Sequence, residues 1–278
     1  MKLLVSHESP IELFEESINY NDYQYCLVHL MEENEQYRDW FLNVSKRFGA
    51  DVLLDNSIFE LGESFDPGKY AYWLEEINPN YYIVPDVLQN AYETMNKWTE
   101  WELSHMPPDN KAWRIGVVQG KDWNDLLECY QFMSSEADYI AISFDYDYYK
   151  HTGVGGNKLE RWCTGRQRFI QDLIDRGYWN WSKPHHLLGC SLAREFKYYV
   201  DKNINNIRSC DTSNPIVAAL KGLRYNGDLG LQEKPSTMLC DLIGANVDSD
   251  IHETVMYNTT MFKHILGRYE EEKKLSLV

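Results

Sequence analysis

The sequence contains no Cys-x-x-Cys pair. Its six cysteines are widely separated along the chain (Cys26, Cys129, Cys163, Cys190, Cys210 and Cys240). Zinc sites are usually built from closely spaced cysteine and histidine ligands, so we expect no structural zinc and no other metal site. Scattered cysteines in a chain of this size indicate free thiols in a reducing compartment rather than a disulfide framework.

Long apolar runs are also missing. No segment reaches the roughly 18 apolar residues of a membrane-spanning helix. The first ten residues, MKLLVSHESP, hold an apolar run that is too short for a signal peptide. We therefore expect a soluble, cytoplasmic protein that has no membrane partner.

Basic residues are scarce relative to acidic ones. The chain has 27 lysines and arginines against 43 aspartates and glutamates, which gives a formal net charge of −16. Such a surface argues against a protein that coats nucleic acid through its overall charge. A local basic groove is still possible, and residues 150–168 and 194–208 contain the charges for one. The alternative is that these charges belong to solvated helices and loops.

Short apolar runs recur along the chain, and each is followed by an amphipathic stretch, such as Glu35–Phe48 and Pro67–Ile77. The runs are Leu3–Ser6, Tyr25–Leu30, Val52–Asp55, Tyr81–Pro85, Arg114–Gln119, Tyr139–Phe144, His186–Cys190 and Asn206–Cys210. Eight strand–helix repeats with strands apolar on both faces predict a parallel sheet. In one domain of 278 residues they predict an α/β protein with a (β/α)8 TIM barrel. A doubly wound open sheet is the alternative, because periodicity does not distinguish a closed sheet from an open one.

Two regions depart from the strand–helix repeat. Residues 145–165 form the longest irregular stretch and contain GVGG, which could be a lid over a site or a phosphate-binding loop. The lid is favoured because the stretch lacks the Gly-Lys-Ser/Thr ending of a phosphate loop. After residue 222 a loop or hairpin and two helical segments, Thr237–Ile243 and Ile251–Tyr269, predict a C-terminal extension.

Carboxylates follow three of the predicted strands. Asp55, Asp86 and Asp211 each stand at a strand end, where the active sites of TIM barrels lie. Asp211 alone could be the N-cap of the next helix, since Thr212, Ser213 and Pro215 are residues typical of a helix start. Helix capping explains the three aspartates together poorly. The repulsion among their charges is unfavourable, and a function that needs these charges would offset it.

The ordered segments around these acids resemble a known family. DNSIF (residues 55–59), VPDV (84–87), VVQG (117–120), LLGCSLARE (187–195) and CDTSNPIVAALKG (210–222) follow one another as their counterparts do in the tRNA-guanine transglycosylases. That family has a (β/α)8 barrel, and the resemblance covers about 60 % of the chain. The chain lacks the family's C-terminal zinc module and is shorter. It is closer in kind to the small viral or genomic-island relatives that place 7-deazaguanine bases in DNA.

The resemblance implies a role for each segment. Asp211 would be the nucleophile that holds a covalent glycosyl intermediate, and Asp55 the general acid and base. Asp86 would accept hydrogen bonds from the guanine edge, and Phe59 would stack on the base. Further substrate contacts would come from the end of strand five and the end of strand seven (Gln119, Gly120, Gly189 and Ser191).

The expected reaction replaces guanine in DNA, rather than in tRNA, by a 7-deazaguanine derivative of the queuine type, without a metal or other cofactor. Two alternatives remain: an N-glycosidase that releases a base to water, and a catalytically silent barrel that binds a nucleobase or a protein. The high tyrosine and tryptophan content is consistent with a homodimer.

Overall fold

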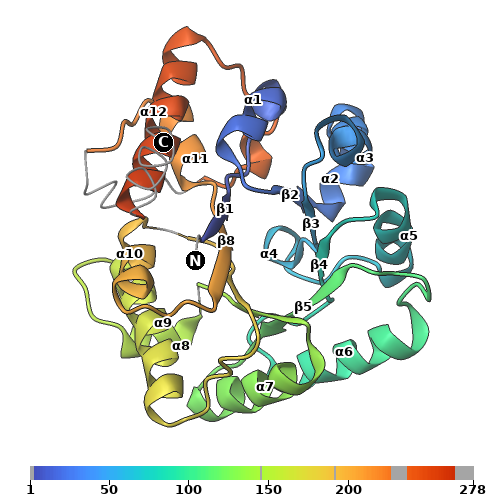
Figure 1. Cartoon of the computed structure of the whole chain (residues 1–278), viewed down its shortest axis with the longest axis vertical. Helices are drawn as coiled ribbons and strands as arrows, with labels where there is room; N and C mark the ends of the chain where they lie inside the picture. The colour runs from blue at the N-terminus through green and yellow to red at the C-terminus, as the bar shows by residue number, and fades with distance from the viewer. Residues whose placement is uncertain (1–2, 145, 191, 227–236, 267–278) are drawn as a thin grey trace, which may run out of the picture.

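Eight short parallel strands form the centre of the molecule, and helices lie around them (Figure 1). The computed structural model describes residues 3–144, 146–190, 192–226 and 237–266. The strands are β1 (Leu4–Ser6), β2 (Gln24–Leu27), β3 (Val52–Asp55), β4 (Tyr81–Ile83), β5 (Trp113–Val118), β6 (Tyr139–Ile142), β7 (His185–Leu187) and β8 (Ile207–Asp211). Most of their side chains are buried, as a sheet covered on both faces requires.

The strands are ordered β1-β8-β7-β6-β5-β4-β3-β2, and β1 pairs in parallel with β8. This order makes a nearly closed TIM barrel and confirms the predicted fold class. The remaining gap, between β1 and β2, is bridged by residues that precede β2. The backbone N–H of Asp22 donates to the carbonyl oxygen of Val5 (2.9 Å), and its carboxylate accepts from the backbone N–H of Val5 (2.8 Å).

The outer layer consists of helices that follow the strands. They are α1 (Phe14–Tyr20), α2 (Val28–Glu33), α3 (Glu35–Phe48), α4 (Ile58–Leu61), α5 (Pro67–Ile77), α6 (Ala91–Ser104), α7 (Trp123–Glu136), α8 (Asp147–Thr152), α9 (Lys158–Asp175), α10 (Arg194–Asp201) and α11 (Asn214–Leu220). Their ends follow local sequence signals. Asn34 caps α3 by accepting from the backbone N–H of Tyr37 (3.0 Å), and Gly49 ends it at φ 67°.

A C-terminal helix, α12 (Ser249–Ile265), packs on α11 beside the barrel. The buried amide of Asn258 joins the two helices. Its nitrogen donates to the carbonyl oxygens of Pro215 (3.1 Å) and Leu223 (3.0 Å), and its oxygen accepts from the backbone N–H of Tyr225 (2.8 Å). The predicted extension is therefore packed against the barrel. None of the described helices combines the length and the apolar character that a membrane crossing requires.

The structure corrects three of the predicted elements. The second strand ends at Leu27, and the predicted continuation to Leu30 belongs to α2. The predicted helix Thr237–Ile243 is a 3-10 turn, η3 (Cys240–Leu242). The predicted loop over residues 145–165 contains α8 and the first turns of α9, so only residues 153–157 lie between helices. The predicted loop or hairpin after residue 222 lies mostly outside the described residues, since 227–236 are not among them.

Candidate active site

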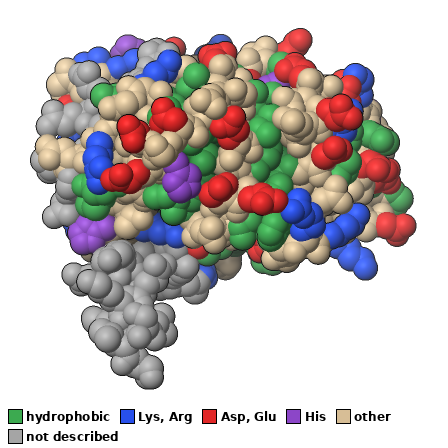
Figure 2. All heavy atoms as spheres, turned by 90° about the horizontal axis from the view of Figure 1, so that it is seen from above, with side chains coloured by type: hydrophobic (Ala, Val, Ile, Leu, Met, Phe, Trp, Pro, Cys, Tyr) green, Lys and Arg blue, Asp and Glu red, His purple; other side chains and the backbone are tan. Residues whose placement is uncertain are grey.

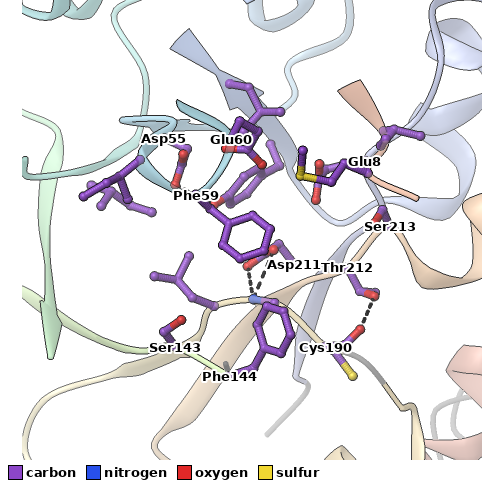
Figure 3. Close-up of a pocket in the computed structure, with 18 of the residues that line it drawn as sticks. Glu8, Asp55, Phe59, Glu60, Ser143, Phe144, Cys190, Asp211, Thr212 and Ser213 are labelled. Atoms are coloured by element: carbon purple, nitrogen blue, oxygen red, sulfur yellow. Dashed lines mark hydrogen bonds between the residues drawn. The ribbon is translucent and has the colours of Figure 1, made fainter. Parts of the chain in front are cut away.

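A pocket of about 430 Å³ opens at the carboxyl ends of the strands. Six of the residues predicted for the site line it: Asp55, Phe59, Asp86, Gln119, Gly189 and Asp211. Figure 3 shows Asp55 and Asp211 reaching it from different strands, β3 and β8. The barrel thus brings together side chains that are more than 150 positions apart in the sequence.

Asp211 is the last residue of β8, and its carboxylate is held from two sides. The backbone N–H of Gly189 donates to both oxygens (3.0 and 3.2 Å), and the imidazole Nε2 of His186 lies 3.0 Å from Oδ1. Asp211 is not the N-cap of α11, because the backbone N–H of Asn214 donates to the hydroxyl of Thr212 instead (3.0 Å). The carboxylate faces the pocket rather than the helix, which excludes the capping alternative.

His186 is a site residue that the sequence did not single out. Its ring is buried in β7, and Nδ1 lies 2.8 Å from the hydroxyl of Ser209, which in turn lies 2.7 Å from the hydroxyl of Tyr139. Ser209 and Asp211 stand two positions apart on β8 and therefore share a face. The backbone register pairs His186 with Ser209. The position of this histidine on the strand beside Ser209 and Asp211 was the sequence signal that could have identified it.

A buried arginine holds the backbone that contacts Asp211. Nη1 of Arg166 donates to the carbonyl oxygens of Ile142 (3.0 Å) and Leu188 (2.9 Å), and Nη2 donates to that of Gly189 (2.9 Å). Arg166 also donates to both oxygens of the buried Glu195 (2.6 and 2.9 Å). The Leu188–Gly189 peptide therefore joins Arg166 at its oxygen to Asp211 at its N–H.

Gly189 is required at this position for two reasons. Its φ of 65° lies in the left-handed region that favours glycine, and an added Cβ would lie 2.3 Å from the Phe144 ring. The sequence reading placed its backbone against the substrate. In the structure the N–H of Gly189 holds the Asp211 carboxylate instead.

Asp55 is buried at the end of β3. Its Oδ2 accepts from the hydroxyl of Tyr25 (2.7 Å), and its Oδ1 accepts from the backbone N–H of Ser57 (2.6 Å). Burial, and to a smaller extent the charges of Glu60 and Asp211, raises the pKa of Asp55 well above its ordinary range, despite these two hydrogen bonds. A carboxyl group with a raised pKa can hold a proton and deliver it near neutral pH.

Ser57 adopts a backbone conformation that is rare for serine. Its φ of 59° lies in the left-handed region, and its side chain is completely buried. The conformation directs its N–H to Asp55, so this loop keeps a shape that glycine favours although serine occupies it.

Asp86 is held by two amide side chains. Asn56 donates to Oδ1 (2.8 Å) and Gln119 donates to Oδ2 (2.6 Å), while the oxygen of Gln119 accepts from the backbone N–H of Gln89 (2.7 Å). Burial raises the pKa of Asp86 to about 6, although both amide hydrogen bonds oppose the shift. Gln119 was predicted to contact the substrate. The structure assigns both ends of its amide to protein partners.

Aromatic rings form one wall of the pocket. Phe59 is 45 % exposed, and its ring centroid lies 6.0 Å from that of Phe144, which contacts Trp162 edge to face at 5.5 Å. Figure 3 shows Phe59 and Phe144 side by side in the pocket. Phe59 therefore presents an accessible ring face, whereas Phe144 and Trp162, which the sequence reading missed, extend that apolar surface.

The pocket is strongly acidic. Besides the three predicted aspartates, Glu8 and Glu60 line it, and Figure 3 shows Glu60 between Asp55 and Glu8. The sequence analysis assigned no role to either glutamate. Among the described lining residues, Lys158 is the only lysine or arginine. This charge distribution favours neutral or hydrogen-bond-donating groups inside the pocket.

Gly120, one of the predicted substrate contacts, is not among the described residues that line the pocket. It packs against the start of α7, where an added Cβ would lie 2.6 Å from the backbone nitrogen of Leu126, so this contact requires its small size. Ser191 lies outside the described residues.

Within the described part of the chain, no group of three or more histidine, cysteine, aspartate or glutamate residues is arranged to hold a metal ion. No protein-family model matches the chain, and no curated protein matches its sequence.

Proposed function

We propose that this protein is a transferase that exchanges guanine in DNA for a 7-deazaguanine base through a covalent aspartyl-glycosyl intermediate. The main support for the proposal is that one pocket contains two carboxyl groups in different environments. Asp211 is held by two donors at the end of β8, and Asp55 has a raised pKa at the end of β3.

The proposed reaction has two displacements at the anomeric carbon of the target nucleotide. An oxygen of Asp211 attacks this carbon, and the bond from the carbon to the guanine nitrogen breaks. The leaving nitrogen takes the proton of Asp55. The incoming base then gives a proton to Asp55, attacks the same carbon and releases Asp211. Electrons and protons balance over the two steps without an oxidant or a reductant.

The surroundings of Asp211 support its role as the nucleophile. Gly189 and His186 fix the direction of the carboxylate, and the Arg166 contacts fix the Gly189 backbone in turn. A reacting group that is held in place loses less entropy on reaching the transition state. His186 and the shorter of the two Gly189 contacts go to Oδ1, so Oδ2, which has only the 3.2 Å contact with Gly189, keeps a lone pair for the attack.

The rest of the pocket supports a purine-like base as the group that enters it. Phe59 offers a ring face for stacking, which contributes about 1–3 kcal/mol per base. Asp86 supplies a carboxylate for the N1–H and amino edge of guanine, a pairing in which both donors meet an acceptor. The segment resemblance to DNA-modifying relatives supports DNA, rather than tRNA, as the polymer.

The test follows the fate of guanine. DNA and RNA that contain radiolabelled guanine are incubated with the protein, with and without a 7-deazaguanine base. Release from DNA that requires the added base is expected. Release without it would show an N-glycosidase, release from RNA alone would exclude DNA as substrate, and no release would favour a binding protein.

A variant links the reaction to Asp211. Asp211→Asn should lower exchange by at least about 10³-fold, because an amide cannot form the glycosyl ester. Its Tm should stay near that of the wild type, and no protein–DNA adduct should survive denaturation. Asp109→Asn changes the same charge at an exposed position and is the control, with full exchange expected. Full exchange by Asp211→Asn would refute the proposal.

A further inference from the structure

One stretch of this acidic chain is basic. Residues 148–171 contain five lysines and arginines and a single acidic residue, Glu160, in a protein whose net charge is −16. Arg166 is buried against Glu195, and Asp147 and Asp172, at the two ends of the stretch, pair with Lys150 and Arg168. The stretch forms most of α8 and α9, which pack closely together beside the barrel. Figure 2 shows acidic and basic side chains intermingled over one face of the molecule.

The negative charge of Glu160 is already compensated within the protein. Its Oε1 accepts from Arg194 of α10 (2.6 Å), and its Oε2 accepts from the backbone N–H of Gly156 (2.6 Å). These partners lower the pKa of Glu160, mainly through the hydrogen bond from Arg194. Glu160 is therefore not available to neutralise the neighbouring lysines.

Two lysines converge on one ring at the pocket. The Nζ atom of Lys158 lies 4.0 Å from the ring centroid of Trp162, and that of Lys150 lies 5.6 Å from it. Trp162 and Lys158 both line the pocket, and Lys158 is exposed. Lys150 is paired with Asp147, whereas no ion pair of Lys158 is found among the described residues. The two ammonium groups stand against the single carboxylate of Asp147, so a net positive charge remains at the ring.

The interior of the pocket has the opposite charge. Five carboxyl groups line it, so a phosphate would be repelled from the interior and attracted to the lysines beside Trp162. A nucleotide in a polymer has to place its base inside the pocket and keep its phosphates outside. The charge distribution matches this division.

We propose that Lys150 and Lys158 bind the phosphodiester backbone of the DNA strand on either side of the target nucleotide. Trp162 fixes the position of both ammonium groups, and the strand passes the pocket on the α8–α9 side. This inference names the polymer-binding surface of the proposed function and rests on it.

The test measures DNA binding and its salt dependence. The ligand is a fluorescent single-stranded oligonucleotide with one guanine, and Kd is measured by anisotropy at several NaCl concentrations. Each phosphate contact to a single strand contributes a slope of about −0.7 in log K against log salt. The variant Lys150→Gln/Lys158→Gln should reduce the slope by about 1.4 and weaken binding at low salt.

Lys111→Gln is the matched control, because Lys111 is exposed and precedes β5, at the opposite end of the strands. It should keep the wild-type slope, and circular dichroism should show that both variants fold. An unchanged slope in the double variant, or no DNA binding by the wild type, would overturn the inference. Equal losses for guanosine monophosphate and the oligonucleotide would also overturn it, since they would indicate a pocket for one phosphate.

This readout does not depend on catalysis. If the wild type binds DNA through the two lysines and no guanine is exchanged, the binding surface stands and the proposed function fails. If guanine is exchanged and the slope is unchanged in the double variant, the function stands and the surface fails.

Discussion

The carboxyl group of Asp55 is buried, and burial is unfavourable for its ionised form. Its folded-state pKa is raised, mainly by burial, so the ionised form destabilises the folded protein. A group of this kind lowers stability as pH rises from its unfolded pKa toward its folded one. Natural proteins retain such a cost where a function requires it.

Asp55→Asn should therefore stabilise the protein while it abolishes base exchange. The Tm gain should be absent at pH 3.5 and largest at pH 8, with about 2–4 °C for each kcal/mol gained. Thermal unfolding of both proteins across this range gives the comparison. A variant that is less stable than the wild type at pH 8 would show that Asp55 has a structural role.

The raised pKa of Asp86 predicts that base binding depends on pH. Its pKa of about 6 means that it is mostly protonated at pH 5 and mostly ionised at pH 7. The ionised form accepts two hydrogen bonds from a guanine edge, so affinity for free guanine should rise through a midpoint near pH 6. Calorimetric titration between pH 5 and 7.5 measures it.

Two variants show which carboxyl group gives rise to this midpoint. Asp86→Asn should bind weakly and lose the pH dependence, whereas Asp55→Asn should keep the midpoint, because Asp86 is intact in it. A midpoint that moves in Asp55→Asn and stays in Asp86→Asn would assign the titration to Asp55 instead.

The sequence anticipated the acids of the site better than it anticipated their partners. Asp55, Asp86 and Asp211 stand at strand ends, and a barrel brings all such ends to one mouth. His186 and Arg166 escaped notice because their roles depend on contacts between elements far apart in the chain. Gln119 and Gly189 line the pocket, as predicted, but their hydrogen bonds go to neighbouring protein groups.

At the scale of elements, helices with clear end signals were predicted closely. Glu35–Phe48 and Pro67–Ile77 agree with α3 and α5 at both ends, since Asn34 and Asp66 cap them and Gly49 ends the first. The stretch 145–165 was read as a loop because its glycines suggested irregular backbone. Gly165 instead lies within α9, where an added Cβ would lie 2.5 Å from the carbonyl oxygen of Tyr149. Close packing of α8 on α9, rather than flexibility, requires this glycine.

The pair of Arg166 and Glu195 connects α9 and α10 to the ends of β6 and β7. Arg166→Met would leave the charge of Glu195 buried with only the Tyr199 hydroxyl as a donor and should cost about 3–5 kcal/mol. Arg166→Met/Glu195→Leu removes both charges and should cost less. Because the Leu188–Gly189 peptide loses its donor in both, we expect single-turnover adduct formation to slow by up to about 10²-fold in the double variant.

Comparing the stability of each variant with its rate of adduct formation shows whether the pair acts in folding or in positioning the Leu188–Gly189 peptide. Arg166→Lys keeps a charge beside Glu195 but loses the planar fork, so its rate should lie between those of the wild type and the double variant. A double variant that forms adduct at the wild-type rate would show that the pair acts in folding alone.

At the scale of the whole molecule, the fold was predictable because eight repeats specify a barrel almost by number. The closure was not: β1 and β2 lack direct ladder pairing, and Asp22 bridges them through its backbone and side chain. Side-chain bridges of this kind leave no periodic signal. The packing of α12 on α11 likewise depends on Asn258, whose partners lie more than 30 positions away.

Net charge makes a prediction for the molecule as a whole. At −16 the folded protein repels itself, because folding brings the carboxylates closer together. Raising NaCl from 0.05 to 0.5 M shortens the screening length from more than 10 Å to less than 8 Å, so Tm should rise. The same change should weaken oligonucleotide binding, because phosphate contacts release counterions.

The two responses have opposite signs in one protein, which makes them diagnostic. A general salt effect on hydration would change Tm and leave the binding slope of Lys150→Gln/Lys158→Gln equal to that of the wild type. If self-repulsion and a local basic surface are both present, the double variant should keep the salt-dependent rise in Tm and lose part of the binding slope. A Tm that falls with NaCl would show that attractive ion pairs outweigh the repulsion. The basic stretch would then stabilise the barrel through pairs such as Arg194–Glu160.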